Sequence, residues 1–330
     1  MADGYAPHVF EGIGLGYIDN AEPEIFPRAR SLDDKRRYRA FFGCSSDVTT
    51  SLWLKLQPQW HINIMARPKH LLWSLVFLKV YASEIALSAM VGSPDEKTFR
   101  KWTQLFVDAI SWLEADVVCL RMKEVCVLLW LFLISNIRLL LLITLQILWE
   151  NRRINDIGND CLVSVDGTDF RIKQIKPWSE AWYSYKYNGP GLRYEVGVCI
   201  RTGAIVWIHG PFAPGDYNDI EIFRHAMIAF LEDGERVEAD AGYRGEHPRY
   251  VKIPDVLEEG TNVQRMRQRL MKRHETVNKR LKNFGCLKQA FRHDLVFHSA
   301  CFRAVAVVTQ LAFENGEPVF QVDYDDLLPP

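Results

Sequence analysis

The chain has 330 residues, with 40 lysines and arginines against 41 aspartates and glutamates, and a formal charge of −1 at neutral pH. This length predicts two domains, or one large domain with an appendage. With 48% hydrophobic and 25% charged residues, the composition excludes a low-complexity, disordered or collagen-like chain. The near-neutral total is also not typical of nucleic-acid-binding proteins, which usually carry a basic excess.

Cysteine usage and the N-terminal sequence indicate an intracellular protein. The 7 cysteines are scattered without a CxxC pair, which favours a reducing compartment over a disulfide framework. The first 30 residues are acidic and lack the apolar core of a secretory signal. We therefore expect a protein that is not exported.

The N-terminal third changes character near residue 60. Residues 1–60 are polar and turn-rich without sustained periodicity, so we expect an arm or a loosely docked segment. Residues 61–116 place apolar side chains at helical spacing, as in HLLWSLVFLKVYA from His70. This second region is expected to be helical.

A helix start is predicted within that helical region. Ser93 is a candidate N-cap, followed by Pro94 at the first helical position and Glu96 at the third. A short helix, a turn near Gly92 and a longer basic helix match a helix-turn-helix outline. Three-helix units are also common packing modules, so DNA recognition by this region is one of two interpretations.

Residues 117–148 form an atypical apolar segment. The run from Val125 to Trp149 is long enough to cross a bilayer, but Asn136 and Arg138 interrupt it at its middle. Three interpretations stay open: a membrane span, a buried core helix, or a sequence foreign to the working protein, such as an unspliced intron. A membrane protein is the least favoured of the three.

Residues 149–330 predict an α/β domain. The runs CLVSVDGTDFRI, LRYEVGVCI and AIVWIHG are short strands separated by turn signals, and they form a meander. A helix follows Asn218, and RVEAD is a fourth strand expected to return beside the first. Long helices begin near Val263 and Phe297. This order predicts an RNase H-like mixed sheet flanked by helices, with the N-terminal helical, helix-turn-helix-like region before it.

Three acidic residues stand where this layout would bring them together: Asp166 at or near the end of the first strand, Asp240 at the end of RVEAD, and Glu275 on the following basic helix. Carboxylates a few ångströms apart repel one another, so such a cluster normally needs a cation or a shared proton. Hard divalent metals suit oxygen ligands and support cleavage or transfer of a phosphodiester. A single aspartate at a strand end, however, is more often a turn former or a helix cap.

Nearby acidic residues compete for the same role. Asp169 lies three residues after Asp166, and Asp216 and Asp219 lie in the PGDYND turn. Asp219 is more economically explained as an N-terminal helix residue. Asp169 shares a sheet face with Asp166 only if the strand bulges or ends between them.

Five segments in order resemble the nuclease domain of Harbinger/PIF-type transposases, members of the DDE superfamily of endonucleases. They are SVDGTDFRI, GLRYEVGV, PGDYNDIEIFR, VEADAGYRG and RHETVNKRLKNFGCLKQAFRH. The resemblance implies that Asp166, Asp240 and Glu275 are the metal-binding catalytic triad, with 73 and 34 residues between them. The family often has an aromatic residue and a glycine after the glutamate, where this chain has Asn278 and Lys279.

The resemblance also implies a reaction and partners. We expect two Mg²⁺ or Mn²⁺ ions, a water-mediated nick at the element's end, and strand transfer by the freed 3′ hydroxyl. The expected partners are transposon-end and target DNA, a Myb-like DNA-binding protein and a second copy of the chain, and the expected location is the nucleus of a eukaryotic cell. The alternative function is a catalytically inactive transposon-derived DNA-binding or scaffold protein.

The charge is strongly segregated along the chain. Residues 211–260 carry 12 acidic and 5 basic side chains, whereas residues 261–300 carry 10 basic and 2 acidic ones. A run of one sign is usually a solvated face, but it would repel itself unless it met phosphate. We therefore predict DNA-backbone contacts from this helix, by Arg269, Lys272, Arg273, Lys279, Arg280 and Lys282.

Two further groups have both a structural and a functional interpretation. His293, His298, Cys301 and Cys286 match no standard zinc spacing, which favours core or interface roles. An aromatic cluster follows the first strand, with packing as the default and stacking on an unpaired base at the cut end as the sharper hypothesis. Its members are Trp178, Trp182, Tyr183, Tyr185 and Tyr187.

Overall fold

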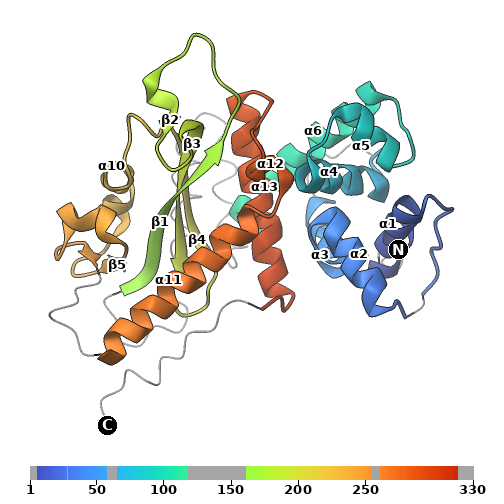
Figure 1. Ribbon diagram of the computed structural model, residues 1–330. Coiled ribbons are helices and arrows are strands. Elements are labelled where there is room, and N and C mark those ends of the chain that lie inside the picture. Colours follow the sequence, from blue (N-terminus) through green and yellow to red (C-terminus); the bar gives the residue numbers. More distant parts are fainter. Residues whose placement is uncertain (1–5, 28, 58–64, 118–160, 254–260, 319–330) are drawn as a thin grey trace, which may run out of the picture. The chain divides into compact units, whose positions relative to one another are not determined.

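The structure is a computed structural model, which describes residues 6–27, 29–57, 65–117, 161–253 and 261–318 (Figure 1). Two compact units make up the chain. Unit 1 is formed by residues 1–114 and 279–317, and unit 2 by residues 115–278 and 318–330. The structure thus divides the chain differently from the sequence-based boundaries, because residues 279–317 pack with the N-terminal helices. The apolar run from Val125 to Trp149 lies outside the described residues.

Unit 1 is helical. Its N-terminal part contains α1 (Pro7–Asp19), α2 (Leu32–Phe42), α3 (Ser46–Leu56), α4 (Pro68–Val80), α5 (Glu84–Met90) and α6 (Glu96–Trp112). α7 (Glu114–Val117) crosses the boundary between the units, and α12 (Gly285–Lys288) and α13 (Leu295–Glu314) complete unit 1. α4 and α13 supply much of the core, because nearly all of their apolar side chains are buried.

The expectation of a polar arm over residues 1–60 is wrong for the described part of that segment. α1, α2 and α3 bury Phe10, Tyr38, Phe42 and Trp53, each at most 4% exposed. Tyr38 and Phe42 pack ring against ring, and Trp53 stacks on Phe106 of α6. Aliphatic residues such as Val48 and Leu52 of α3 are buried as well, so this segment is a packed part of unit 1.

The predicted start of α6 is displaced by two residues. Asp95 is the N-cap, and its carboxylate accepts the backbone N–H of Thr98 at 3.1 Å. Ser93 instead adopts a left-handed φ of 52° in the turn after α5. Arg100 of α6 makes an ion pair with Glu84 of α5. This pair ties the two helices of the helix-turn-helix outline together, while DNA recognition by them stays a prediction.

One described helix, α13, has the length and apolar character of a membrane span, with a mean hydropathy of 1.5. Two-thirds of its apolar window (67%) is buried inside the structure. Burial of this extent is what the core helix of a folded unit shows.

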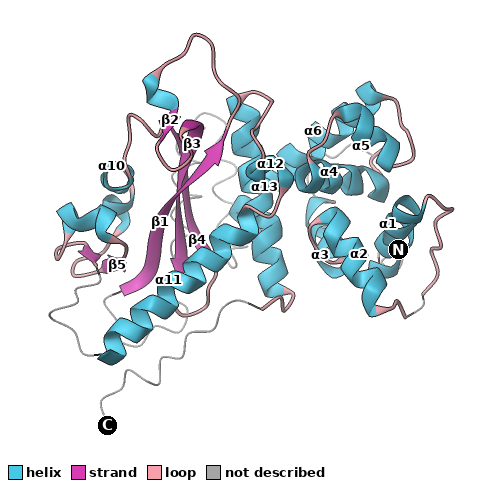
Figure 2. Cartoon of the chain, in the orientation of Figure 1, coloured by secondary structure: helices cyan, strands magenta, loops and turns pink. Residues whose placement is uncertain are grey.

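Unit 2 is built on a mixed sheet (Figure 2). The strands are β1 (Cys161–Arg171), β2 (Tyr183–Ser184), β3 (Gly189–Cys199), β4 (Ile205–Phe212), β5 (Arg236–Glu238) and β6 (Val251–Lys252). β1, β3 and β4 form an antiparallel meander. β5 returns parallel to β1, and β6 extends the sheet in parallel beyond β5. The predicted RNase H-like α/β layout is confirmed.

Helices flank this sheet. α10 (Asp219–His225) follows β4, and the short 3₁₀ helices η3 (Glu180–Trp182), η4 (Met227–Phe230) and η5 (Ala241–Glu246) lie in the connections. The long α11 (Thr261–Leu281) passes across the strands of the sheet in Figure 1. His274 Nδ1 of this helix lies 3.0 Å from the Ser164 hydroxyl of β1. Val163, Trp207, Phe223 and Tyr243 belong to the core under the sheet.

Candidate active site

Asp166 lies within β1, and Asp240 follows the end of the neighbouring parallel strand β5. β1 and β5 are in register at Ser164 and Glu238, so each aspartate follows its strand's last shared pair by two residues. Asp240 begins η5, and its carboxylate accepts the backbone N–H of Gly242 at 2.8 Å. Asp166 is half-buried and Asp240 is exposed. β1 continues to Arg171, so Asp166 lies inside the strand rather than at its end, and the charges of Asp166 and Asp240 both act on the buried phenol of Tyr243.

The helix that carries Glu275 is docked against Asp166. Asn278 of α11 donates its side-chain amide to Asp166 Oδ2 at 2.9 Å. Glu275 precedes Asn278 by three residues, and side chains at this spacing are neighbours on a helix surface. Glu275 is exposed. Within the described ranges no three His, Cys, Asp or Glu side chains converge closely enough to hold a metal, so the complete triad stays a prediction.

Asp219 lies closer to Asp166 than its interpretation as an N-terminal helix residue indicated. It starts α10 as expected, beside the N-cap Asn218, but its carboxylate also reaches the strand segment after Asp166. A Cβ atom on Gly167 would lie 1.9 Å from Asp219 Oδ1, so this close approach requires the glycine. Asp219 also lies within ion-pair range of Arg193 at 3.4 Å and Lys186 at 3.7 Å.

Asp169 is structural. It is fully buried, and Arg193 donates to both of its oxygens, from Nε at 2.7 Å and Nη2 at 3.0 Å. The Ser184 hydroxyl donates to Asp169 Oδ2 at 2.6 Å. A carboxylate that is neutralised and saturated in this way is unsuited to bind a metal. Of the two aspartates in β1, Asp166 is therefore the better candidate for a metal ligand.

A buried tyrosine reports the acidic character of this edge. Tyr243 of η5 is fully buried, and its pKa is raised well above the ordinary value, first by burial and then by the negative charges of Glu195, Asp219, Asp166 and Asp240. Burial also raises the pKa of Glu195 to about 8, against the opposing hydrogen bond from Trp207 Nε1 at 2.9 Å. Four carboxyl groups thus raise the pKa of the same phenol, which indicates that their negative charges gather at this edge of the sheet.

The donor set fits a hard divalent cation. Its atoms are carboxylate and amide oxygens, which Mg²⁺ and Mn²⁺ prefer. The amide Oδ1 of Asn278 is buried and has no hydrogen-bond partner among the described residues, although its Nδ2 is engaged with Asp166. A buried acceptor left in this state is unfavourable unless another donor or a cation meets it.

The predicted DNA-binding residues separate into two groups. Arg269, Lys272 and Lys279 are exposed, and Lys282 is half-buried. Arg273 was predicted to contact DNA, but it is 2% exposed and donates to the backbone carbonyls of Ile200 and Arg201. That prediction is corrected, because Arg273 lies on the same helical stripe as Leu270 and Val277 and holds α11 to the turn after β3.

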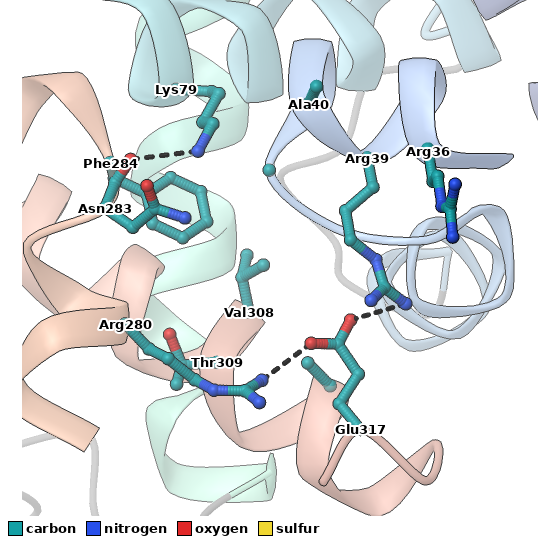
Figure 3. Close-up of a pocket in the computed structure, with 12 residues that line it drawn as sticks. Arg36, Arg39, Ala40, Lys79, Arg280, Asn283, Phe284, Val308, Thr309 and Glu317 are labelled. Carbon is teal, nitrogen blue, oxygen red and sulfur yellow. Dashed lines mark hydrogen bonds and ion pairs between the residues drawn. The ribbon is translucent and has the colours of Figure 1, made fainter. Parts of the chain in front are cut away.

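Arg280 also has an intramolecular role. It donates to Glu317 at 2.7 Å, and Arg39 pairs with the same carboxylate at 3.0 Å (Figure 3). These residues line a cavity of about 480 Å³ within unit 1, to which Arg36 and Lys79 also contribute. Lys79 donates to the Asn283 carbonyl at 2.9 Å. The predicted phosphate contact of Arg280 would therefore compete with an existing ion pair.

The histidine and cysteine set lies in unit 1. Cys286, Cys301 and His298 are buried, and His293 Nδ1 is 2.9 Å from the Tyr81 hydroxyl. These positions agree with the core role that the sequence favours.

A scan against protein families matches residues 157–308 to the family described as "Transposase DDE domain". Searches of curated proteins and of solved structures gave no match. The matched segment contains β1, β3, β4, β5 and α11, and with them Asp166, Asp240 and Glu275. The match supports a transposase-type endonuclease of the DDE superfamily, the broader group to which the sequence motifs pointed.

Proposed function

We propose that the chain is a DDE-type transposase, or an endonuclease derived from one, of the Harbinger/PIF type, which cleaves DNA phosphodiesters and transfers the strand. The observation that carries this proposal is the placement of Asp166 and Asp240 two residues beyond the last paired residues of the parallel strands β1 and β5, with Asp166 hydrogen-bonded to the helix that bears Glu275. The family match and the ordered motifs support it.

Asp166, Asp240 and Glu275 would hold Mg²⁺ or Mn²⁺, and a pair of ions would supply an activated water and stabilise the leaving 3′ oxygen. The chain's own residues prepare this site. Asn278 orients the Asp166 carboxylate, and Gly167 lets Asp219 approach the same strand. The exposed Arg269, Lys272 and Lys279 would attract the DNA backbone without sequence preference.

The proposed setting follows from the same resemblance. Transposon ends and target DNA are the proposed substrates, a Myb-like DNA-binding protein and a second copy of the chain are the proposed partners, and the nucleus is the proposed location. Neutralisation of the basic residues by DNA phosphate is the physical basis for the DNA contacts.

The test is cleavage of a supercoiled plasmid that carries the element's terminal repeats, with and without Mn²⁺. Asp166→Asn and Asp240→Asn should each lower the cleavage rate by about 100-fold or more, because each removes a charge made for the metal. Asp216→Asn is the matched control, since Asp216 is an exposed aspartate of the PGDYND turn. Thermal unfolding of each variant, with and without Mn²⁺, gives a second measure of metal binding. Unchanged cleavage by either site variant would refute the assignment.

The second candidate, an inactive DNA-binding or scaffold protein, makes a different prediction in the same assay. It would bind the plasmid with steep salt dependence but show no Mn²⁺-dependent cleavage, and its unfolding temperature would not respond to Mn²⁺.

A further inference from the structure

We propose that Trp178, Tyr185 and Tyr217 form a stacking surface for unpaired DNA bases beside the candidate active site. This inference rests on the proposed function and specifies where the single-stranded end of the substrate binds. These three residues are all of the exposed large hydrophobic side chains in the described part of unit 2, at 44%, 81% and 39% exposure. All three are aromatic, and no large aliphatic side chain whose exposure is described in unit 2 is exposed to this degree.

The segment that carries Trp178 and Tyr185 is fastened to β1 immediately after Asp166. Lys186 Nζ donates to the Gly167 carbonyl at 2.7 Å, and the Tyr187 hydroxyl donates to the Asp169 carbonyl at 3.0 Å. The Ser184 hydroxyl donates to the Asp169 carboxylate. Three successive anchors therefore end within three residues of Asp166, and they hold the exposed rings at this part of the strand.

Tyr217 belongs to a second segment that is attached to the same place. The backbone N–H of Gly215 donates to the Ala181 carbonyl of η3 at 2.8 Å. A Cβ atom on Gly215 would lie 2.3 Å from the Glu180 carbonyl oxygen, so the two backbones are in direct contact. Arg193 donates to the Tyr217 carbonyl at 3.2 Å. η3 and the turn before α10 thus form one block next to the acidic edge.

The rings are arranged to support one another and still offer open surface. Tyr183 packs edge to face with Trp178, at 6.4 Å between centroids, and with Tyr185, at 5.1 Å. Tyr183 itself is half-buried, so it serves packing, whereas its two neighbours reach solvent. Stable edge-to-face pairs fix ring orientation and lower the entropic cost of binding a flat ligand.

The charge of the segment identifies the ligand as nucleic acid. Residues 171–187 contain four basic side chains, Arg171, Lys173, Lys176 and Lys186, against the single acidic Glu180. Exposed aromatic rings interleaved with cations are the combination that binds single-stranded nucleic acid, because bases stack on the rings and phosphates meet the cations. The position beside Asp166 places these bases next to the strand end that is cut.

The test compares binding of two fluorescent duplexes of the same sequence, one blunt and one with a short single-stranded overhang. Fluorescence anisotropy is measured with CaCl₂ in place of Mn²⁺, and 2-aminopurine in the overhang reports stacking by its quenching. Tyr185→Ala and Trp178→Ala should each weaken binding of the overhang duplex by about tenfold and leave the blunt duplex unchanged. Tyr185→Phe should restore binding, since it keeps the ring.

Phe26→Ala is the matched control, because Phe26 of unit 1 is 73% exposed and has no place in this surface. Overhang affinity within twofold of wild type in both alanine variants would overturn the inference, and so would equal losses on the two duplexes. A wild-type protein that cleaves the plasmid but shows no overhang preference refutes the stacking surface alone. A wild-type protein that neither binds nor cleaves DNA refutes the proposed function as well.

Discussion

Replacement of Asn278 by aspartate would place a second carboxylate against Asp166. In the native protein a neutral amide donates to Asp166 Oδ2 at 2.9 Å. Two unit charges 4 Å apart repel by about 4 kcal/mol at an effective dielectric near 20. Both residues are only partly buried, so solvent reduces this repulsion to about 2 kcal/mol. Loss of a hydrogen bond to a charged group adds about 1.5 kcal/mol.

We therefore expect Asn278→Asp to lose about 3.5 kcal/mol of folding free energy without metal. A domain of roughly this size loses about 2 to 4 °C in Tm per kcal/mol, which predicts a decrease of about 7 to 14 °C at pH 7.5. Asn278→Ala is the control that removes only the hydrogen bond, and its Tm should fall by about 3 to 6 °C. Scanning calorimetry in EDTA measures both.

Two further measurements separate charge repulsion from general damage. The difference in Tm between Asn278→Asp and Asn278→Ala should become smaller as the pH falls toward 4, because one carboxyl of a repelling pair then binds a proton. Mn²⁺ should raise the Tm of Asn278→Asp more than that of the wild type, since a cation relieves the repulsion. Equal Tm values for the two variants at pH 7.5, with no narrowing in acid, would show that Asn278 does not contact the Asp166 carboxylate.

Three other predictions concern the neighbours of the site. Lys272→Ala should lower the slope of log DNA affinity against log salt concentration by about one. Arg273→Ala should leave this slope unchanged but lower the free energy of unfolding by about 3 kcal/mol, which a fall in Tm would report. Asp169→Asn should cost about 3 kcal/mol in urea unfolding, because it leaves the charge of Arg193 buried and uncompensated. The raised pKa of Glu195, about 8, destabilises the fold as the pH rises from about 4.5 to 8, since the unfolded state ionises first and the folded state must follow. Glu195→Gln should therefore be more stable than the wild type at pH 8.5 by several kcal/mol. Urea unfolding of both proteins at pH 5 and pH 8.5 measures this, and the same difference in unfolding free energy at the two pH values would contradict it.

The sheet could be predicted because its signals are local. β1, β3 and β4 are apolar runs bounded by turn residues, and a meander needs only short connections. The return of β5 beside β1 follows from the RVEAD strand and the handedness of crossover connections, and the parallel register at Ser164 and Glu238 agrees with it. The positions of Asp166 and Asp240 follow directly from this strand order.

The missed features depend on contacts that composition does not encode. Arg273 was predicted to contact DNA because it belongs to the basic run along α11. Its spacing from Leu270 and Val277, however, already places it on the buried side of this helix. The helices of residues 7–56 were missed because their buried side chains, among them Leu52 and Trp53 of α3, are interspersed with many polar and turn-forming residues. The approach of Asp219 to Gly167 joins residues far apart in sequence, so no local pattern predicts it.

Pairing inside unit 2 explains which carboxylates of the acidic edge are suited to a metal. Arg193 donates two hydrogen bonds to Asp169. Arg193 and Lys186 both lie within ion-pair distance of Asp219. Asp166 instead accepts from a neutral amide, and Asp240 accepts from a backbone N–H. A neutral donor orients a carboxylate without cancelling its charge, and the charges of Asp166 and Asp240 both help to raise the pKa of Tyr243. The near-zero net charge of the chain is therefore compatible with the proposed function, in which a metal would neutralise the acidic centre and DNA phosphate would neutralise the basic helix.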